Sequence, residues 1–499
     1  MSQWTVQPLA FGSPRSEPPE PISDRHDILS ASTYPESPTM IAGLALEMDS
    51  DQKQRSASLE IEASAVDIAV GMEEQFAMFT TASNCEEAPP SISDDDRLSS
   101  AKFVLVTLVV LGHFIEAYSK AGNQVATIIM HLIYSFHVPA FVLISGYYSK
   151  DLTPARRRKL LSGLVLPYVI LQPLFCVAYA GLFCVSDGSE TQDGMMTRNW
   201  SLGDGDWNYF YPFAHLWYLI SLLSMRIWLP FALEMKYTVA FHMILGCLVG
   251  YNDSFDGRFL SIHRTVVLLP YFIAGRLLEE SRTLLRPVGI KLKCTAFFFV
   301  LVQVAGSVLA SQVDMPLDIL FRADSYAEVL GEYSSYGGLV QLGCYVWTTM
   351  CLASFFTILH MVTEEKKTSY ISISVGQIDG SRDQRDRAKS SWRDRLVLKL
   401  AFWGRQSMYI YILHMAVLML MAKFGYYDGL LDIIESDEVG ITVQVVGTSM
   451  LAVLVSVLLT LNLVVPTIFK CLIEPDVGKF IFRTRNTLVE SESSASLVM

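Results

Sequence analysis

The sequence predicts an all-helical, polytopic protein that crosses a membrane about ten times. Of its 499 residues, 51% are hydrophobic and only 18% are charged, with a mean hydropathy of +0.35. Soluble chains of this length are less apolar. Long apolar segments recur after residue 102, and the loops between them alternate between basic and acidic composition. Together these observations place residues 98–473 in a membrane-embedded domain.

Residues 1–97 are predicted to form a disordered, acidic, cytoplasmic tail. The first 96 positions hold 18 acidic and 4 basic residues among many Pro and Ser residues, and they bury too little apolar surface to offset the cost of ordering. This tail accounts for the net charge of −12, so no nucleic-acid partner is indicated. No basic segment leads into an apolar core, so no cleaved signal peptide is expected. Residues 474–499 are expected to be a short cytoplasmic tail.

Ten apolar segments are expected to form helices in contact with membrane lipids. Most are long enough for the roughly 20 residues that a helical span requires. The fifth and sixth are the shortest. The segments are 103–118, 125–147, 160–185, 213–229, 237–251, 265–278, 294–310, 337–362, 396–424 and 443–469.

Charges in the loops predict how these helices are oriented. The second, sixth and eighth loops are basic, and the second contains Lys150 and the run RRRK at 156–159. Other loops are acidic, as in DGSETQDG and YYDGLLDIIESDE. Because short cytoplasmic loops collect Lys and Arg, both termini are expected in the cytoplasm, at an endomembrane or the plasma membrane. The third loop then faces outward, and Asn199 in its sequon is a predicted N-glycosylation site.

Three histidines are expected at similar depth in separate helices. His113 lies in the first apolar segment, His137 in the second and His414 in the ninth. A rise of 1.5 Å per residue places His113 and His137 roughly 16 and 19 Å from the cytoplasmic face. Ionisable side chains inside a span are costly, which makes them functional candidates. Glu116 follows His113 by three residues, so the two side chains share a helix face.

Several motifs follow one another in the order typical of a known family. The first segment, AKFVLVTLVVLGHFIE, has a basic residue, Lys102, eleven positions before His113. FHVPAFVLISGYYSK, ARRRKLLSGLVLPY, HLWYLISLL, LPYFIAGRLL and GRQSMYIYILHM follow. In this combination the chain resembles the acyltransferase 3 family of integral-membrane acyltransferases, particularly sugar O-acetylases similar to fucose 4-O-acetylase. It departs from the pattern at Ser99 and Ser100, where the family often has an Asp-Asn pair.

The resemblance implies acyl transfer from a cytoplasmic acyl-CoA, usually acetyl-CoA, to a hydroxyl of a carbohydrate or lipid-linked acceptor. An imidazole is suited to remove the hydroxyl proton near neutral pH. We therefore expect His113 to be the base and Glu116 to orient it, with His137 as a further catalytic residue. Coenzyme A is polyanionic, and the residues expected to bind its phosphates are Lys102, Arg156, Arg157 and Arg158. The residues expected to bind the acceptor are His215, Trp217 and His414.

Each assignment has a simpler alternative. The histidines could serve only as interhelical hydrogen-bonding groups, Glu116 could lie at the outer interface, and the basic run could only set topology. Trp217 could belong to the aromatic belt at the membrane surface. The alternative function is a proton-coupled secondary transporter with an intramembrane His/Glu relay, although no internal repeat typical of transporters is visible.

The remaining unusual residues are expected to be structural. Gly112 and Gly146 would let neighbouring helices, or the pantetheine arm, approach closely. The eight cysteines show no metal-type spacing, so neither a metal site nor a structural disulfide is expected. Four histidines are expected near the membrane faces, namely His131, His242, His263 and His360.

Overall fold

The computed structural model describes most of the predicted membrane domain. The chain divides into two units, residues 1–87 and residues 88–499, and every described residue belongs to the second. The described residues are 92–180, 182, 209–252, 259–281, 284, 288–321, 324–363, 392–427, 438–460, 469, 470 and 473. The proposed acidic tail up to residue 91, the loop that carries Asn199 and the tail 474–499 lie outside them.

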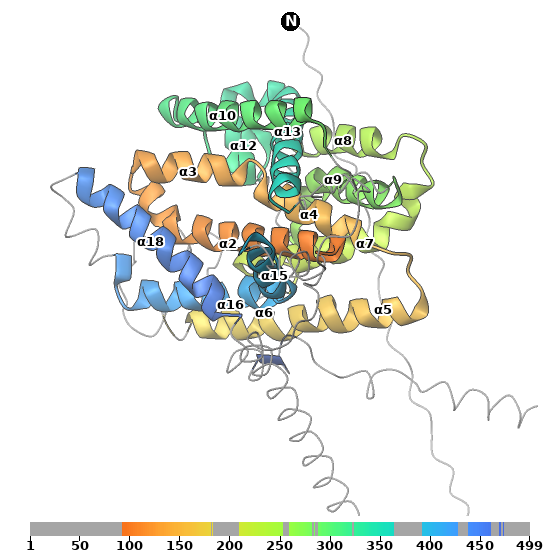
Figure 1. Ribbon diagram of the computed structural model, residues 1–499, viewed down its shortest axis with the longest axis horizontal. Helices are drawn as coiled ribbons and strands as arrows, with labels where there is room; N and C mark the ends of the chain where they lie inside the picture. The colour runs from red at the N-terminus through yellow and green to blue at the C-terminus, as the bar shows by residue number, and fades with distance from the viewer. Residues whose placement is uncertain are drawn as a thin grey trace, which may run out of the picture. The chain divides into compact units, whose positions relative to one another are not determined.

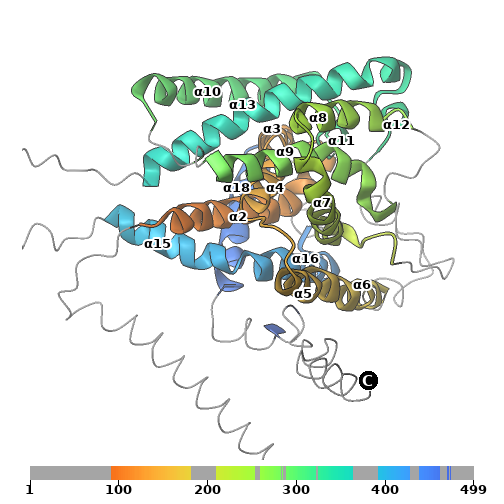
Figure 2. The ribbon, with the colours of Figure 1, turned by 90° about the vertical axis from the view of Figure 1, so that its right-hand side faces the viewer.

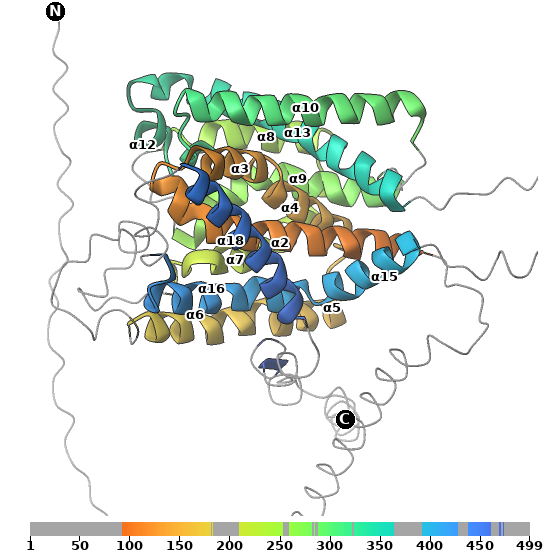
Figure 3. The same cartoon turned by 60° about the vertical axis from the view of Figure 1, so that its left-hand side comes forward.

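The described part of the chain is helical throughout, with no strand. Many of its longer helices run side by side, as Figures 1 and 3 show. The helices central to the argument are α2 (Asp94–Lys120), α3 (Gln124–Tyr134), α4 (His137–Tyr147), α5 (Pro154–Leu160), α6 (Leu166–Tyr179), α7 (Trp217–Leu233), α9 (Ile262–Ser281), α15 (Trp392–Arg405) and α16 (Ser407–Lys423). The others are α8 (Thr238–Val249), α10 (Ile290–Gln312), α11 (Asp318–Phe321), α12 (Tyr326–Leu330), α13 (Gly337–Thr363) and α18 (Glu438–Leu458). Helices α10 and α13 pack against each other along one side (Figure 2).

Several of these helices are long and apolar enough to cross a membrane. Six meet that standard in the described residues, and α15 with α16 makes a seventh if the 68° bend between them is counted as one broken span. Helices α8 and Val443–Leu458 are apolar but shorter, and α9 carries four charged residues. The multi-pass, all-helical prediction is therefore confirmed. The predicted number of about ten spans is supported only in part, although a helix forms at each of the ten segments.

Helix α2 begins earlier than the apolar pattern predicted. Its first residue is Asp94, so the last residues of the proposed tail are helical. The cause is a capping box: the Ser93 hydroxyl accepts a hydrogen bond from the Asp96 amide at 3.1 Å, and the Asp96 carboxylate accepts one from the Ser93 amide at 3.0 Å. Three aspartates in this first turn also oppose the positive end of the helix dipole.

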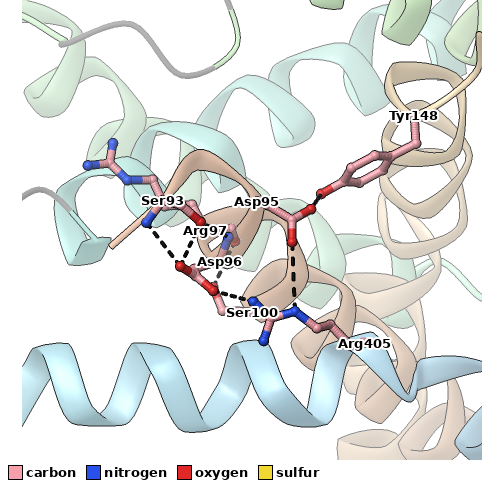
Figure 4. A network of polar contacts seen from close by, with 7 residues as sticks. All are labelled: Ser93, Asp95, Asp96, Arg97, Ser100, Tyr148 and Arg405. Carbon is pink, nitrogen blue, oxygen red and sulfur yellow. Dashed lines mark hydrogen bonds and ion pairs between the residues drawn. The ribbon is translucent and has the colours of Figure 1, made fainter. Parts of the chain in front are cut away.

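A polar network joins the start of α2 to the bend between α15 and α16 (Figure 4). Arg405, the last residue of α15, pairs with Asp96 and lies 3.7 Å from the Asp95 carboxylate. Tyr148 donates a hydrogen bond to Asp95 at 2.7 Å. Burial, together with the adjacent Asp95 carboxylate, raises the pKa of Tyr148, so its hydroxyl stays protonated. The ammonium of Lys102 lies 5.0 Å from the centre of the same tyrosine ring.

Glycines allow the central helices to pack at short range. A Cβ on Gly404 would collide with the carbonyl oxygen of Ser99, and one on Gly146 would collide with that of Phe272. Gly112 faces the Tyr134 ring, which a Cβ would meet at 3.0 Å. The prediction that Gly112 and Gly146 permit close approach is confirmed, since α2 and α4 each meet a neighbouring helix there.

Candidate active site

The centre of the candidate site is His113 on α2. Its Nδ1 lies 3.6 Å from one carboxylate oxygen of Glu116, and Nζ of Lys120 lies 3.1 Å from the other. The side chain of His113 is 27% exposed and that of Glu116 is 16% exposed. A tautomer with its proton on Nδ1 directs that proton at the carboxylate and leaves Nε2 free to accept another. This is the orientation that a general base requires.

Two further histidines complete a cluster around His113. The rings of His113 and His414, on α16, are stacked with centroids 5.4 Å apart. His215, in the short helical turn η6 (Ala214–Leu216) before α7, meets His414 edge-on at 5.2 Å. His414 is fully buried and His215 is 2% exposed. Sequence reasoning placed His113 and His414 at one depth, and the fold brings them into contact.

The backbone that carries His215 is held by two long-range contacts. Gln172 on α6 accepts a hydrogen bond from the Phe213 amide and donates one to the Tyr211 carbonyl, both at 2.8 Å. The hydroxyl of Tyr411 on α16 donates to the carbonyl of His215. Ala214 takes a positive φ of 35°, a conformation that a non-glycine residue adopts only when its surroundings enforce it. The position of His215 is therefore fixed before any substrate binds.

The histidine cluster contains buried imidazole nitrogens without hydrogen-bond partners. Nδ1 of His414 lies 3.1 Å from the Ile410 carbonyl, so it carries the proton in the neutral ring. Nε2 of His414 and both ring nitrogens of His215 have no hydrogen-bond partner among the described residues. Leaving such groups unpaired costs roughly 1–3 kcal/mol each, a cost that a bound substrate hydroxyl or carbonyl would remove.

His137 and Trp217 lie in different surroundings from the histidine cluster. Nδ1 of His137 lies 2.8 Å from the Ile133 carbonyl, and its ring meets Tyr134 edge-on at 4.7 Å. Tyr134 in turn packs over Gly112, one residue before His113. The ring of Trp217 is partly buried, and the guanidinium of Arg264 lies 4.8 Å from the ring centre.

The predicted phosphate-binding residues gather at one end of the bundle. Figure 3 shows α5, the amino-terminal end of α2 and the start of α15 at that end. Lys102 is half-buried beside Tyr148, whereas Arg156, Arg157 and Arg158 are exposed on α5. The exposed run is accessible to a polyanion that arrives from this side.

Four other histidines are buried between helices. We expected His131, His242, His263 and His360 near the membrane faces, yet all four are buried among helices. His242 is fixed by the Trp228 indole at 2.8 Å and the Thr238 carbonyl at 2.7 Å. Burial among helices does not test how far these rings lie from the membrane faces, so their location stays a prediction.

Sequence reasoning missed Tyr134, Gln172, Arg264 and Tyr411. The sequence contains one signal for Arg264, a cation directly beside the apolar run TVVLLPYFIAG. Gln172 and Tyr411 act through partners far away in the chain, and Tyr134 reaches Gly112 on another helix, contacts that no local pattern reveals. In the described residues, no cluster of three His, Cys, Asp or Glu side chains has metal-binding geometry.

Fold and site together describe a multi-pass membrane protein with histidines gathered in its interior. The chain belongs to the acyltransferase 3 family: residues 95–461 match the family's model, described as an acyltransferase domain. The protein is thus a multi-pass membrane enzyme that transfers acyl groups. Comparison with curated proteins found no match, and comparison with solved structures found none either.

Proposed function

We propose that this protein is an O-acyltransferase that moves an acyl group from cytoplasmic acyl-CoA, with acetyl-CoA as the expected donor, to a hydroxyl of a carbohydrate or lipid-linked acceptor. The observation that carries the proposal is the His113–Glu116 pair, with the rings of His414 and His215 packed in series beside it. Family membership supports the acyl-transfer step.

In the proposed reaction His113 acts as the general base. Its Nε2 takes the proton of the acceptor hydroxyl while that oxygen attacks the thioester carbonyl carbon. The carbon–sulfur bond then breaks, the acyl group stays on the acceptor oxygen, and the thiolate takes up a proton and leaves as coenzyme A. Glu116 stabilises the imidazolium that forms. Nε2 of His414 accepts a hydrogen bond from the acceptor, which satisfies a nitrogen that is otherwise buried without a partner.

The remaining predicted residues take supporting roles. Lys102 and the three exposed arginines of α5 attract the phosphates of the donor at the end of the bundle where both termini are proposed to face the cytoplasm. His137 holds Tyr134 against α2, a positioning role that differs from the direct catalytic role expected from the sequence. Trp217, with Arg264 above its ring, forms one wall of the acceptor site.

Acyl transfer in detergent tests this proposal. Purified protein is supplied with acetyl-CoA labelled in its acetyl group, and glycan and lipid extracts are analysed by mass spectrometry for labelled acceptors. An acceptor acetylated by the parent and not by His113→Gln supports the proposal. Family membership favours this outcome over a proton-coupled transporter, which would move a solute and leave acetyl-CoA intact.

A further inference from the structure

Arg226 is a cation in the middle of α7 that the proposed reaction does not yet use. It lies within the apolar span Ala214–Leu233. Its Nε is buried and has no hydrogen-bond partner, and no carboxylate lies within ion-pair distance among the described residues. An arginine in such a position is costly unless a counter-charge is supplied. The missing counter-charge points to an anionic ligand.

Arg226 is partly exposed and shares a face of α7 with residues that pack against other helices. It follows Leu222 by four residues and Leu219 by seven, so the three share one helix face. Leu219 is buried in the hydrophobic core formed by α2, α6 and α16, and Leu222 packs against the core formed by α4 and α9. Arg226 therefore lies on the seam between the two cores.

Arg226 is level with the turn that precedes α6 in the chain. Helices α6 and α7 run antiparallel: Phe175 meets His215 at 5.2 Å, and α7 also packs against the turn η2 (Leu161–Val165). Arg226 lies eleven residues beyond His215, about 16 Å along the helix, which places it beside η2. This segment is a π-helical turn, a distortion common at functional sites, and a Cβ on its Gly163 would touch nothing within 4 Å.

Aromatic side chains lead from the middle of α7 to the candidate active site. The hydroxyl of Tyr218, on the same helix as Arg226, lies 2.8 Å from Oγ of Ser145. The rings of Tyr218 and Tyr411 are 5.6 Å apart, and those of Tyr411 and His215 are 5.2 Å apart. Hydroxyl groups and aromatic rings therefore lie between the cation and the histidines.

We infer that Arg226 binds a phosphate group of the acyl-CoA donor inside the bundle, one step beyond the exposed arginines of α5. The inference rests on the proposed function. Coenzyme A carries its phosphates and its thioester at opposite ends of the extended pantetheine arm, so its phosphate site and reacting centre must be well separated. The basic run at 156–159 lies just before η2 in the chain, and Arg226 lies beside η2. A donor attracted to the basic run is therefore close to Arg226.

The test compares donors with and without phosphates. Acetyl-CoA and S-acetylpantetheine, which lacks every phosphate, are supplied to the full-length parent, to Arg226→Gln and to Lys236→Gln, a matched control at an exposed cation just beyond α7. Arg226→Gln is expected to raise KM for acetyl-CoA roughly 10- to 100-fold, the worth of a charge-assisted hydrogen bond, and to leave KM for S-acetylpantetheine unchanged. Lys236→Gln should change neither value. Equal effects of Arg226→Gln on both donors would overturn the inference.

Binding of coenzyme A itself separates failure of this inference from failure of the proposed function. If the parent transfers no acetyl group, the proposed function fails. The phosphate site would still be supported if coenzyme A raises the thermal stability of the parent and does not raise that of Arg226→Gln. If an anionic phospholipid stabilises the parent but not Arg226→Gln, while coenzyme A stabilises both proteins, Arg226 binds lipid and the inference is contradicted.

A second variant covers the case in which Arg226→Gln does not fold. Arg226→Lys keeps the charge and loses the bidentate geometry for phosphate. A KM that rises for acetyl-CoA and not for S-acetylpantetheine supports the inference. An unchanged KM for both donors would contradict it.

Discussion

Removing the guanidinium of Arg405 tests which interactions hold the bend between α15 and α16 against α2. Arg405 pairs with Asp96, whose side chain is only 10% exposed, while Arg405 is 48% exposed. Arg405→Gln would leave the Asp96 carboxylate with Ser93 as its hydrogen-bonding partner. Because α15 packs closely along α2 and leads directly into α16, the pair also sets where His414 stands relative to His113.

The size of the effect follows from the exposure of the two side chains. Hydrogen bonds to buried charged groups contribute roughly 1.5–3 kcal/mol, and exposed ion pairs contribute roughly 0.2–1 kcal/mol. One partner is buried and the other half-exposed, so we expect a coupling energy of about 1–2 kcal/mol.

A double-mutant cycle measures this coupling. Asp96→Asn, Arg405→Gln and the double variant are compared by denaturant titration in detergent, and kcat for acetyl transfer is measured for each. The double variant is expected to be scarcely less stable than either single variant, and all three are expected to have lower kcat. If the losses of unfolding free energy are additive, with a coupling energy below roughly 0.5 kcal/mol, the two side chains do not stabilise the protein through their interaction.

Three further predictions concern the His113–Glu116 pair, the binding of the acyl-CoA donor and the membrane topology. Glu116→Gln should lower kcat by roughly 10- to 100-fold, less than loss of the base itself, and a kcat equal to the parent's would remove Glu116 from the mechanism. Lys102→Ala and Arg158→Ala should raise KM for acyl-CoA with little change in kcat, and Lys102→Arg should be milder; unchanged KM in both alanine variants would leave these cations a topological role only. Asn199 should be glycosylated in a host that performs this modification, and cleavage of the loop around it by protease added to the cytoplasmic side of sealed membranes would contradict the proposed orientation.

The apolar pattern predicted the helices well because burial in lipid demands long apolar segments. It failed at the beginning of α2, where a local signal was available: Ser93 followed three residues later by Asp96 is a capping box, and it moves the start of the helix to Asp94. The 68° bend after Arg405 has no comparable local signal, because the contact of Gly404 with the Ser99 backbone depends on how α15 packs on α2.

The candidate site was only partly predictable for a related reason. His113 and Glu116 share a helix face, so their spacing alone predicts that they meet. The pairing of His414 with His113 depends on tertiary packing, and only their similar predicted depth suggested it. The contacts of Tyr411 with His215 and of Arg264 with Trp217 could not be predicted, because they depend on how helices distant in the chain pack together.

The most direct test of the central claim is the turnover of His113→Gln with acetyl-CoA and an identified acceptor. Glutamine keeps hydrogen-bonding capacity but does not titrate in the useful pH range, so it separates a structural hydrogen bond from proton transfer. The account predicts a kcat lower by roughly 10²- to 10⁴-fold, with coenzyme A binding and folding preserved. A normally folded His113→Gln protein that transfers acetyl groups at nearly the parental rate would contradict it.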